Sequence, residues 1–92
     1  MDVYAQIAMS IIRKQETIIG PIAIEQAKSI EGMVVDWSKN EIKITGNALE
    51  VIDKLVSKYK ELFGQISVEV CKEAASSITG SLAGEKLPKS LQ

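Results

Sequence analysis

Residues 33–56, "MVVDWSKNEIKITGNALEVIDKLV", decide the fold, because they correspond in order to a strand, a tight turn, a strand and a helix. Apolar and polar residues alternate over 33–37 and again over 41–45, which is typical of strands with one buried face. The short segment 38–40 fits a hairpin loop, since Asn40 tolerates the left-handed backbone that such loops need. The stretch therefore predicts a two-stranded antiparallel hairpin that packs on helices.

A helix over residues 48–63 follows this hairpin. Asn47 can cap its start, and Gly64 is a suitable residue to end it. Its apolar residues recur at alternating spacings of four and three, which indicates one buried helix face: Ala48, Ile52, Leu55, Tyr59 and Leu62. A last helix is expected over 67–78, with Ser67 as its cap.

Two further helices are expected before the hairpin. The first follows Asp2, a possible N-cap, and the Gly20-Pro21 pair should separate it from a second helix that runs to Ile30. The sequence thus predicts an α+β fold in the order helix-helix-strand-strand-helix-helix. We expect one domain over residues 1–79 and a flexible C-terminal tail over 80–92.

Composition narrows the classes of function. Apolar residues make up 46% of the 92-residue chain, and 11 basic against 12 acidic residues give a net charge of −1. Without histidine and with Cys71 alone, no Ser-His or Cys-His pair and no typical zinc site can form within the chain. We therefore expect a cytoplasmic protein with no catalytic residues, cofactor or metal. No internal repeat with a period of 20–50 residues is recognised.

Strand edges and apolar surface that a single chain is not expected to cover favour association with a second copy. A lone two-stranded hairpin is marginal in water and has two unpaired edges, and the first helix is apolar over more than half of its circumference. We expect a homodimer that serves as an accessory or regulatory protein. Its candidate association face comprises Val3, Ile7, Ile11, Ile42 and Ile44.

Residues 18–63 resemble part of a KH domain, through "IIGP" at 18–21 and the hairpin and helix that follow. The resemblance implies binding of single-stranded nucleic acid. However, Pro21 and Ile22 occupy the loop, and Ala23 stands where the second loop glycine of that family would fall. Proline has no N–H to offer to a phosphate. The alternative function is thus a weak nucleic-acid-binding module of KH-like shape that lacks the GxxG loop, with these candidate contacts: Lys39, Lys43, Lys54 and Lys58.

A third possibility is a small-molecule sensor. It would bind its ligand in an apolar pocket between the helices and the hairpin, near Trp37. Trp37 itself is expected to cover one end of the core, because aromatic residues at alternating strand positions are usually buried.

Overall fold

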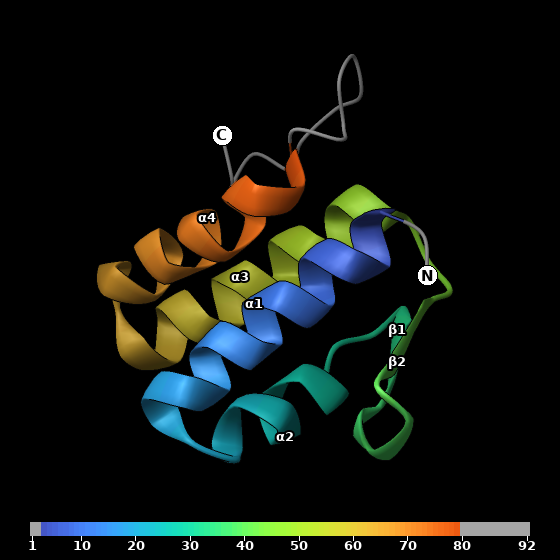
Figure 1. Ribbon diagram of the computed structural model, residues 1–92, viewed down its shortest axis with the longest axis horizontal. Coiled ribbons are helices and arrows are strands. Elements are labelled where there is room, and N and C mark those ends of the chain that lie inside the picture. The colour runs from blue at the N-terminus through green and yellow to red at the C-terminus, as the bar shows by residue number, and fades with distance from the viewer. Residues whose placement is uncertain (1–2, 80–92) are drawn as a thin grey trace.

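Residues 3–79 fold into four α-helices and one β-hairpin in the order that the sequence predicts (Figure 1). The computed structural model describes residues 3–79, so the predicted cap at Asp2 and the predicted tail over 80–92 lie outside the described residues. The elements are α1 (Val3–Ile19), α2 (Ile22–Lys28), β1 (Met33–Asp36), the 3₁₀ turn η1 (Trp37–Lys39), β2 (Glu41–Ile44), α3 (Ala48–Phe63) and α4 (Gln65–Thr79).

The bounds of α3 are those predicted, because a capping residue precedes its start and a glycine follows its end. At its start, the side-chain oxygen of Asn47 accepts a hydrogen bond from the backbone N–H of Glu50 at 3.1 Å. At its end, Gly64 adopts a φ of 86°, a conformation that side chains disfavour. By contrast, α4 begins at Gln65, so the prediction that Ser67 caps this helix is wrong. Ser67 lies inside α4 and is buried.

The hairpin pairs β1 with β2 in antiparallel register, from Met33 opposite Ile44 to Asp36 opposite Glu41. Asn40 is left-handed, as predicted, with a φ of 53°. Arg13 of α1 contacts two residues at the tip of the β-hairpin and so links it to the helices. Its guanidinium lies 5.8 Å from the centre of the half-buried Trp37 ring, and it also donates a hydrogen bond of 3.0 Å to the Asn40 side chain.

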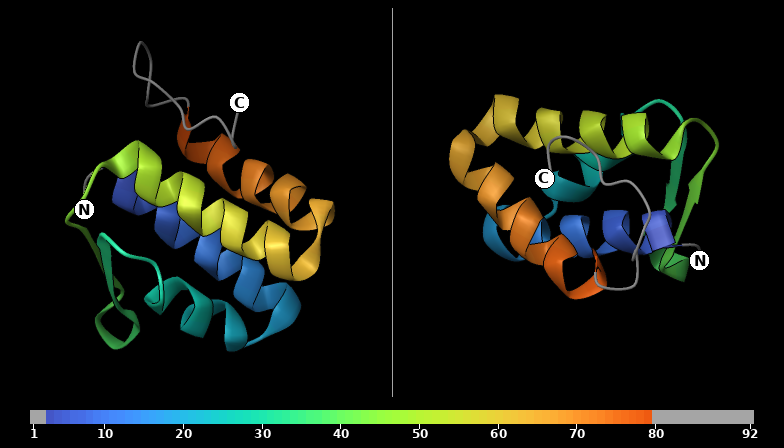
Figure 2. Two further views of the ribbon diagram at one scale, coloured as in Figure 1. Left: turned by 180° about the vertical axis from the view of Figure 1, so that it is seen from behind. Right: turned by 90° about the horizontal axis from the view of Figure 1, so that it is seen from above.

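Helix α1 lies in the middle of the core. Views from two further directions show α2, α3, α4 and the hairpin around it (Figure 2). Its apolar residues on several sides are consequently buried within one chain, including these: Ile7, Ala8, Ile11 and Ile12. The expectation that the neighbours of α1 cannot cover its apolar stripe around Ile7 and Ile11 is therefore wrong, because four elements pack against it, although Ile18 at the end of α1 stays exposed.

The α1–α2 and α3–α4 pairs are two helical hairpins built on one plan. In each, the turn glycine has a positive φ, 80° at Gly20 and 86° at Gly64, and its N–H donates to the carbonyl four residues earlier at 2.8 Å. The next helix then begins with the same 3.1 Å bond to the glycine carbonyl, from Ala23 in one hairpin and Ser67 in the other. Gly20 and Gly64 are separated along the chain by the same number of residues as Ala23 and Ser67. The two helical hairpins are thus an internal repeat, which the sequence prediction did not include.

Candidate functional site

Four large aliphatic side chains are exposed at the turns of the two helical hairpins. We call this surface the apolar end, and it comprises Ile18 (60% exposed), Ile22 (39%), Leu62 (46%) and Ile66 (73%). Helices α1 and α3 both finish at this end of the molecule, and α2 and α4 both start there (Figures 1 and 2). Among residues 3–76, whose side-chain burial is described, Val34 on β1 is the one other exposed large apolar side chain.

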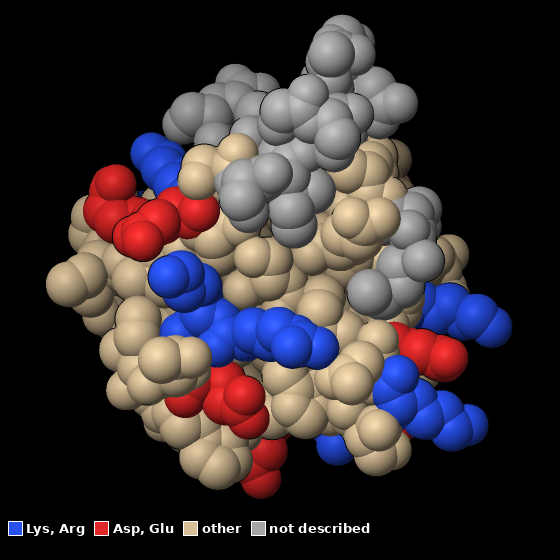
Figure 3. Space-filling model, in the orientation of Figure 1, with Lys and Arg blue, Asp and Glu red and all other residues tan. Residues whose placement is uncertain are grey.

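The apolar end is also uncharged. Neither "TIIGPIAI" (17–24) nor "LFGQISV" (62–68) contains a charged residue, although charged residues make up 25% of the chain. On the face shown in Figure 3, the region over the two helical turns is mainly tan, and lysine, arginine and acidic groups lie beside it. An apolar patch rimmed by polar residues is the usual mark of a binding surface.

Two buried hydrogen bonds hold the elements beneath this surface together. The Gln15 side chain of α1 donates to the backbone carbonyl of Ser67 in α4 at 3.1 Å. The Tyr59 hydroxyl of α3 donates to the backbone carbonyl of Ala23 in α2 at 2.6 Å. Each donor lies three residues before an exposed aliphatic, Ile18 or Leu62. Each bond joins one helical hairpin to the other, so the two turns that carry the apolar end are held in a fixed relative position.

Burial keeps the titratable groups of this base neutral. It raises the pKa of the Cys71 thiol from 9.0 to about 11, although a hydrogen bond from Gln15 at 3.4 Å acts in the opposite direction. Burial also raises the pKa of Tyr59 above its ordinary value of 10.0, and the neighbouring Cys71 adds to that rise. Nucleophilic chemistry requires an accessible thiolate, and Cys71 is a buried thiol.

The residues of the predicted association face do not form one exposed surface. Ile7, Ile11 and Ile42 are buried in the core, and Val3 and Ile44 are half-buried against it. They pack against other parts of the same chain. In the described structure these side chains serve the fold of a single molecule, so a partner would have to bind elsewhere.

The four predicted nucleic-acid contacts belong to two separate parts of the molecule, helix α3 and the β-hairpin. Lys54 and Lys58 lie on α3, and Lys39 and Lys43 belong to the hairpin. Lys39 lies 4.0 Å from the Asp36 carboxylate, a long ion pair between exposed groups. Acidic side chains therefore accompany the hairpin lysines, which weakens the attraction that a phosphate backbone would feel.

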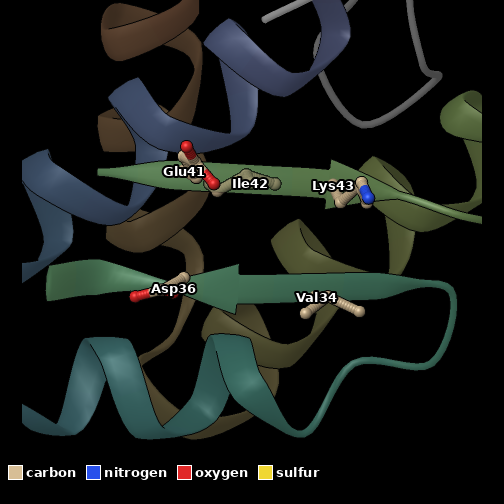
Figure 4. Close-up of a pocket in the computed structure, with 5 residues that line it drawn as sticks. All are labelled: Val34, Asp36, Glu41, Ile42 and Lys43. Carbon is tan, nitrogen blue, oxygen red and sulfur yellow. The ribbon is translucent and has the colours of Figure 1, made fainter. Parts of the chain in front are cut away.

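A depression of about 390 Å³ lies on the outer side of the hairpin (Figure 4). It is lined by Val34, Asp36, Glu41, Ile42 and Lys43. Asp36 and Glu41 are directly opposite each other in the strand register, as are Val34 and Lys43. Trp37 does not line this depression, and three of its five lining residues are charged. It therefore differs from the apolar pocket predicted for a sensor.

Comparison with known proteins does not indicate a function for this chain. No protein-family model matches this chain, and neither the curated proteins nor the solved structures gave a match. Among residues 3–79, no group of three or more acidic or cysteine side chains is placed to hold a metal ion. The helices in that range are too short or too polar to cross a membrane.

The apolar end escaped the sequence analysis, although a signal for it exists. An aliphatic residue stands two positions before each turn glycine and an isoleucine two positions after it: Ile18-x-Gly20-x-Ile22 and Leu62-x-Gly64-x-Ile66. Next to a glycine that ends a helix, such residues are usually expected to pack inward. In this fold they are exposed, and the buried positions three residues before Ile18 and Leu62 are held by Gln15 and Tyr59.

Proposed function

We propose that this protein is an association domain without catalytic activity of its own, and that it forms a homodimer through the apolar end. The observation that supports the proposal is the grouping of four exposed aliphatic side chains on two uncharged turns. Such a surface is costly to leave in water and gains free energy when a partner covers it. We further propose that the protein works in the cytoplasm as an accessory or regulatory component.

The size of the surface sets the expected strength of the dimer. Its four side chains expose on the order of 400 Å², which is within the range of patches that are often functional on monomers. Two copies would bury about twice that area plus a polar rim, which is below the roughly 1,600 Å² of a standard stable interface. The expected dimer is therefore reversible, so monomer and dimer should both be present at accessible concentrations.

The proposal can be tested by size-exclusion chromatography with light scattering from about 10 μM to 1 mM. We expect the mass to rise above the 10.0 kDa of one chain as the concentration increases. Ile66→Glu places a charge in the most exposed position of the apolar end and should abolish the rise. Val34→Glu is the matched control, because Val34 is 57% exposed but lies on the hairpin. A monomer at every concentration, or equal loss in both variants, would contradict the proposal.

A further inference from the structure

The apolar end has an internal two-fold pseudosymmetry, which restricts how a second copy can dock on it. Ile18 corresponds to Leu62 and Ile22 to Ile66, and α1 runs in the same direction as α3 (Figure 1). The pseudo-axis thus leaves the molecule through the apolar end. Two arrangements around a true two-fold axis set the helical hairpins of two copies directly against each other: each helical hairpin faces its own counterpart, or each faces the other helical hairpin.

The aliphatic residues hardly distinguish these two arrangements, because they are nearly the same on both hairpins. The nearby charges can distinguish them. Lys14 corresponds to Lys58 and Glu25 to Glu69, so these positions carry the same charge on both hairpins. At Glu16 and Lys60 the charges are opposite. These two residues are structural equivalents, since each offers its backbone carbonyl to the turn glycine of its hairpin at 2.8 Å.

From this charge pattern we infer that the second copy docks in the crossed arrangement, with its α3–α4 turn over the α1–α2 turn of the first copy. The inference rests on the proposed homodimer. Crossed docking brings Glu16 of each copy toward Lys60 of the other, and it sets the uncharged Thr17 against Glu61. The uncrossed arrangement would bring Glu16 toward Glu16, Lys60 toward Lys60 and Glu61 toward Glu61. Because like charges repel each other, these contacts disfavour the uncrossed arrangement and leave the crossed one as the more stable.

Both groups are available for such contacts. Glu16 is half-buried and Lys60 is exposed, and each lies in the last turn of its helix, next to the apolar end. The two ion pairs described within residues 3–79 join Lys14 to Glu73 and Lys39 to Asp36, so neither engages Glu16 or Lys60. The second copy would thus meet one acidic and one basic group at the rim, which complement each other only in the crossed arrangement.

Charge reversal at a single position tests the arrangement. Glu16→Lys and Lys60→Glu should each raise the dissociation constant of the dimer by about tenfold at low salt, since two attractive exposed pairs become repulsive. An equimolar mixture of the two variants should form a mixed dimer of nearly wild-type affinity, because each mixed pair again joins a lysine to a glutamate. This recovery is the control that both variants still fold and dock. The double variant should recover in the same way. Dissociation constants would be measured by sedimentation velocity at several concentrations.

The controls are Glu41→Lys and Lys43→Glu, which make the same changes in net charge on the hairpin and should leave the dissociation constant within about twofold of wild type. An unchanged dissociation constant in both single variants, with the wild type dimeric and Ile66→Glu monomeric, would overturn the crossed arrangement and leave the association proposal intact. The uncrossed arrangement predicts that result, because its contacts join like charges both before and after each substitution. A wild-type chain that stays monomeric at every concentration would overturn both.

Discussion

The two helical hairpins of this protein share a plan of burial and differ in the residues that carry it out. Gln15 in α1 and Tyr59 in α3 occupy equivalent buried positions and donate to equivalent backbone carbonyls. The donor is a side-chain amide in one helical hairpin and a phenol hydroxyl in the other. Position 27 holds alanine, and its equivalent holds Cys71, yet both are buried. The comparison teaches that burial and turn geometry define each hairpin, whereas residue identity is free to change.

The largest expected effects come from equivalent core positions. Ile11→Ala and Leu55→Ala each remove most of a fully buried side chain, one from each helical hairpin. Each should lower the free energy of unfolding by about 3 kcal/mol, measured by urea denaturation at low protein concentration. Ile18→Ala and Leu62→Ala are the exposed equivalents and should cost less than about 0.5 kcal/mol. A large loss from only one core position would indicate that the two hairpins are not equivalent parts of one core.

The turn glycines should give an intermediate effect. Gly64 has a φ of 86° and a ψ of −173°, a region of backbone conformation that is essentially limited to glycine. Although a Cβ would meet no atom within 4 Å there, Gly64→Ala should cost about 2 kcal/mol through backbone strain alone. Gly20→Ala should follow the same direction, since Gly20 has a φ of 80°. Gly46→Ala is the control, because its φ is not positive and a Cβ would make ordinary contacts at 3.5 Å or more.

The sequence predicted the elements well and their mutual arrangement less well. Helix α3 and the hairpin turn depend on Asn47, Gly64 and Asn40, whose effects act within a few residues, and their predictions are confirmed. The outward side of α1 could not be predicted, because it depends on how many distant elements surround that helix. Ile7 and Ile11 were therefore assigned to a partner although the chain buries them itself.

The internal repeat was missed for a related reason. Across 15–23 and 59–67, only Gly20 with Gly64 and Ile22 with Ile66 are identical pairs. What the two segments share is the order of buried and exposed positions, which becomes visible once the helices are placed. A sequence comparison that scores burial class, and not residue identity, could have found the repeat and the apolar end together.

The smallest expected effect is the dependence of stability on alkaline pH. The pKa of Cys71 is about 11 in the folded state against an ordinary value of 9.0, so the folded state retains a proton that the unfolded state loses. The contribution is fully present below pH 9 and declines between pH 9 and 11, by about 1.4 kcal/mol at pH 10. Cys71→Ala makes this position match its equivalent, Ala27, and should delay the decline until Tyr59 begins to contribute near pH 10. An unchanged decline between pH 9 and 10 would contradict this assignment.

The measurement that most directly tests the apolar end as a docking surface is a dilution series of the ¹⁵N-labelled chain followed by amide chemical shifts. If a second copy docks there, the amides of residues 17–24 and 62–68 should shift with concentration along one binding curve. The amides of the hairpin, residues 33–44, should stay in place over the same range. Concentration-dependent shifts confined to residues 33–44, or no dependence on concentration up to about 1 mM, would contradict the account.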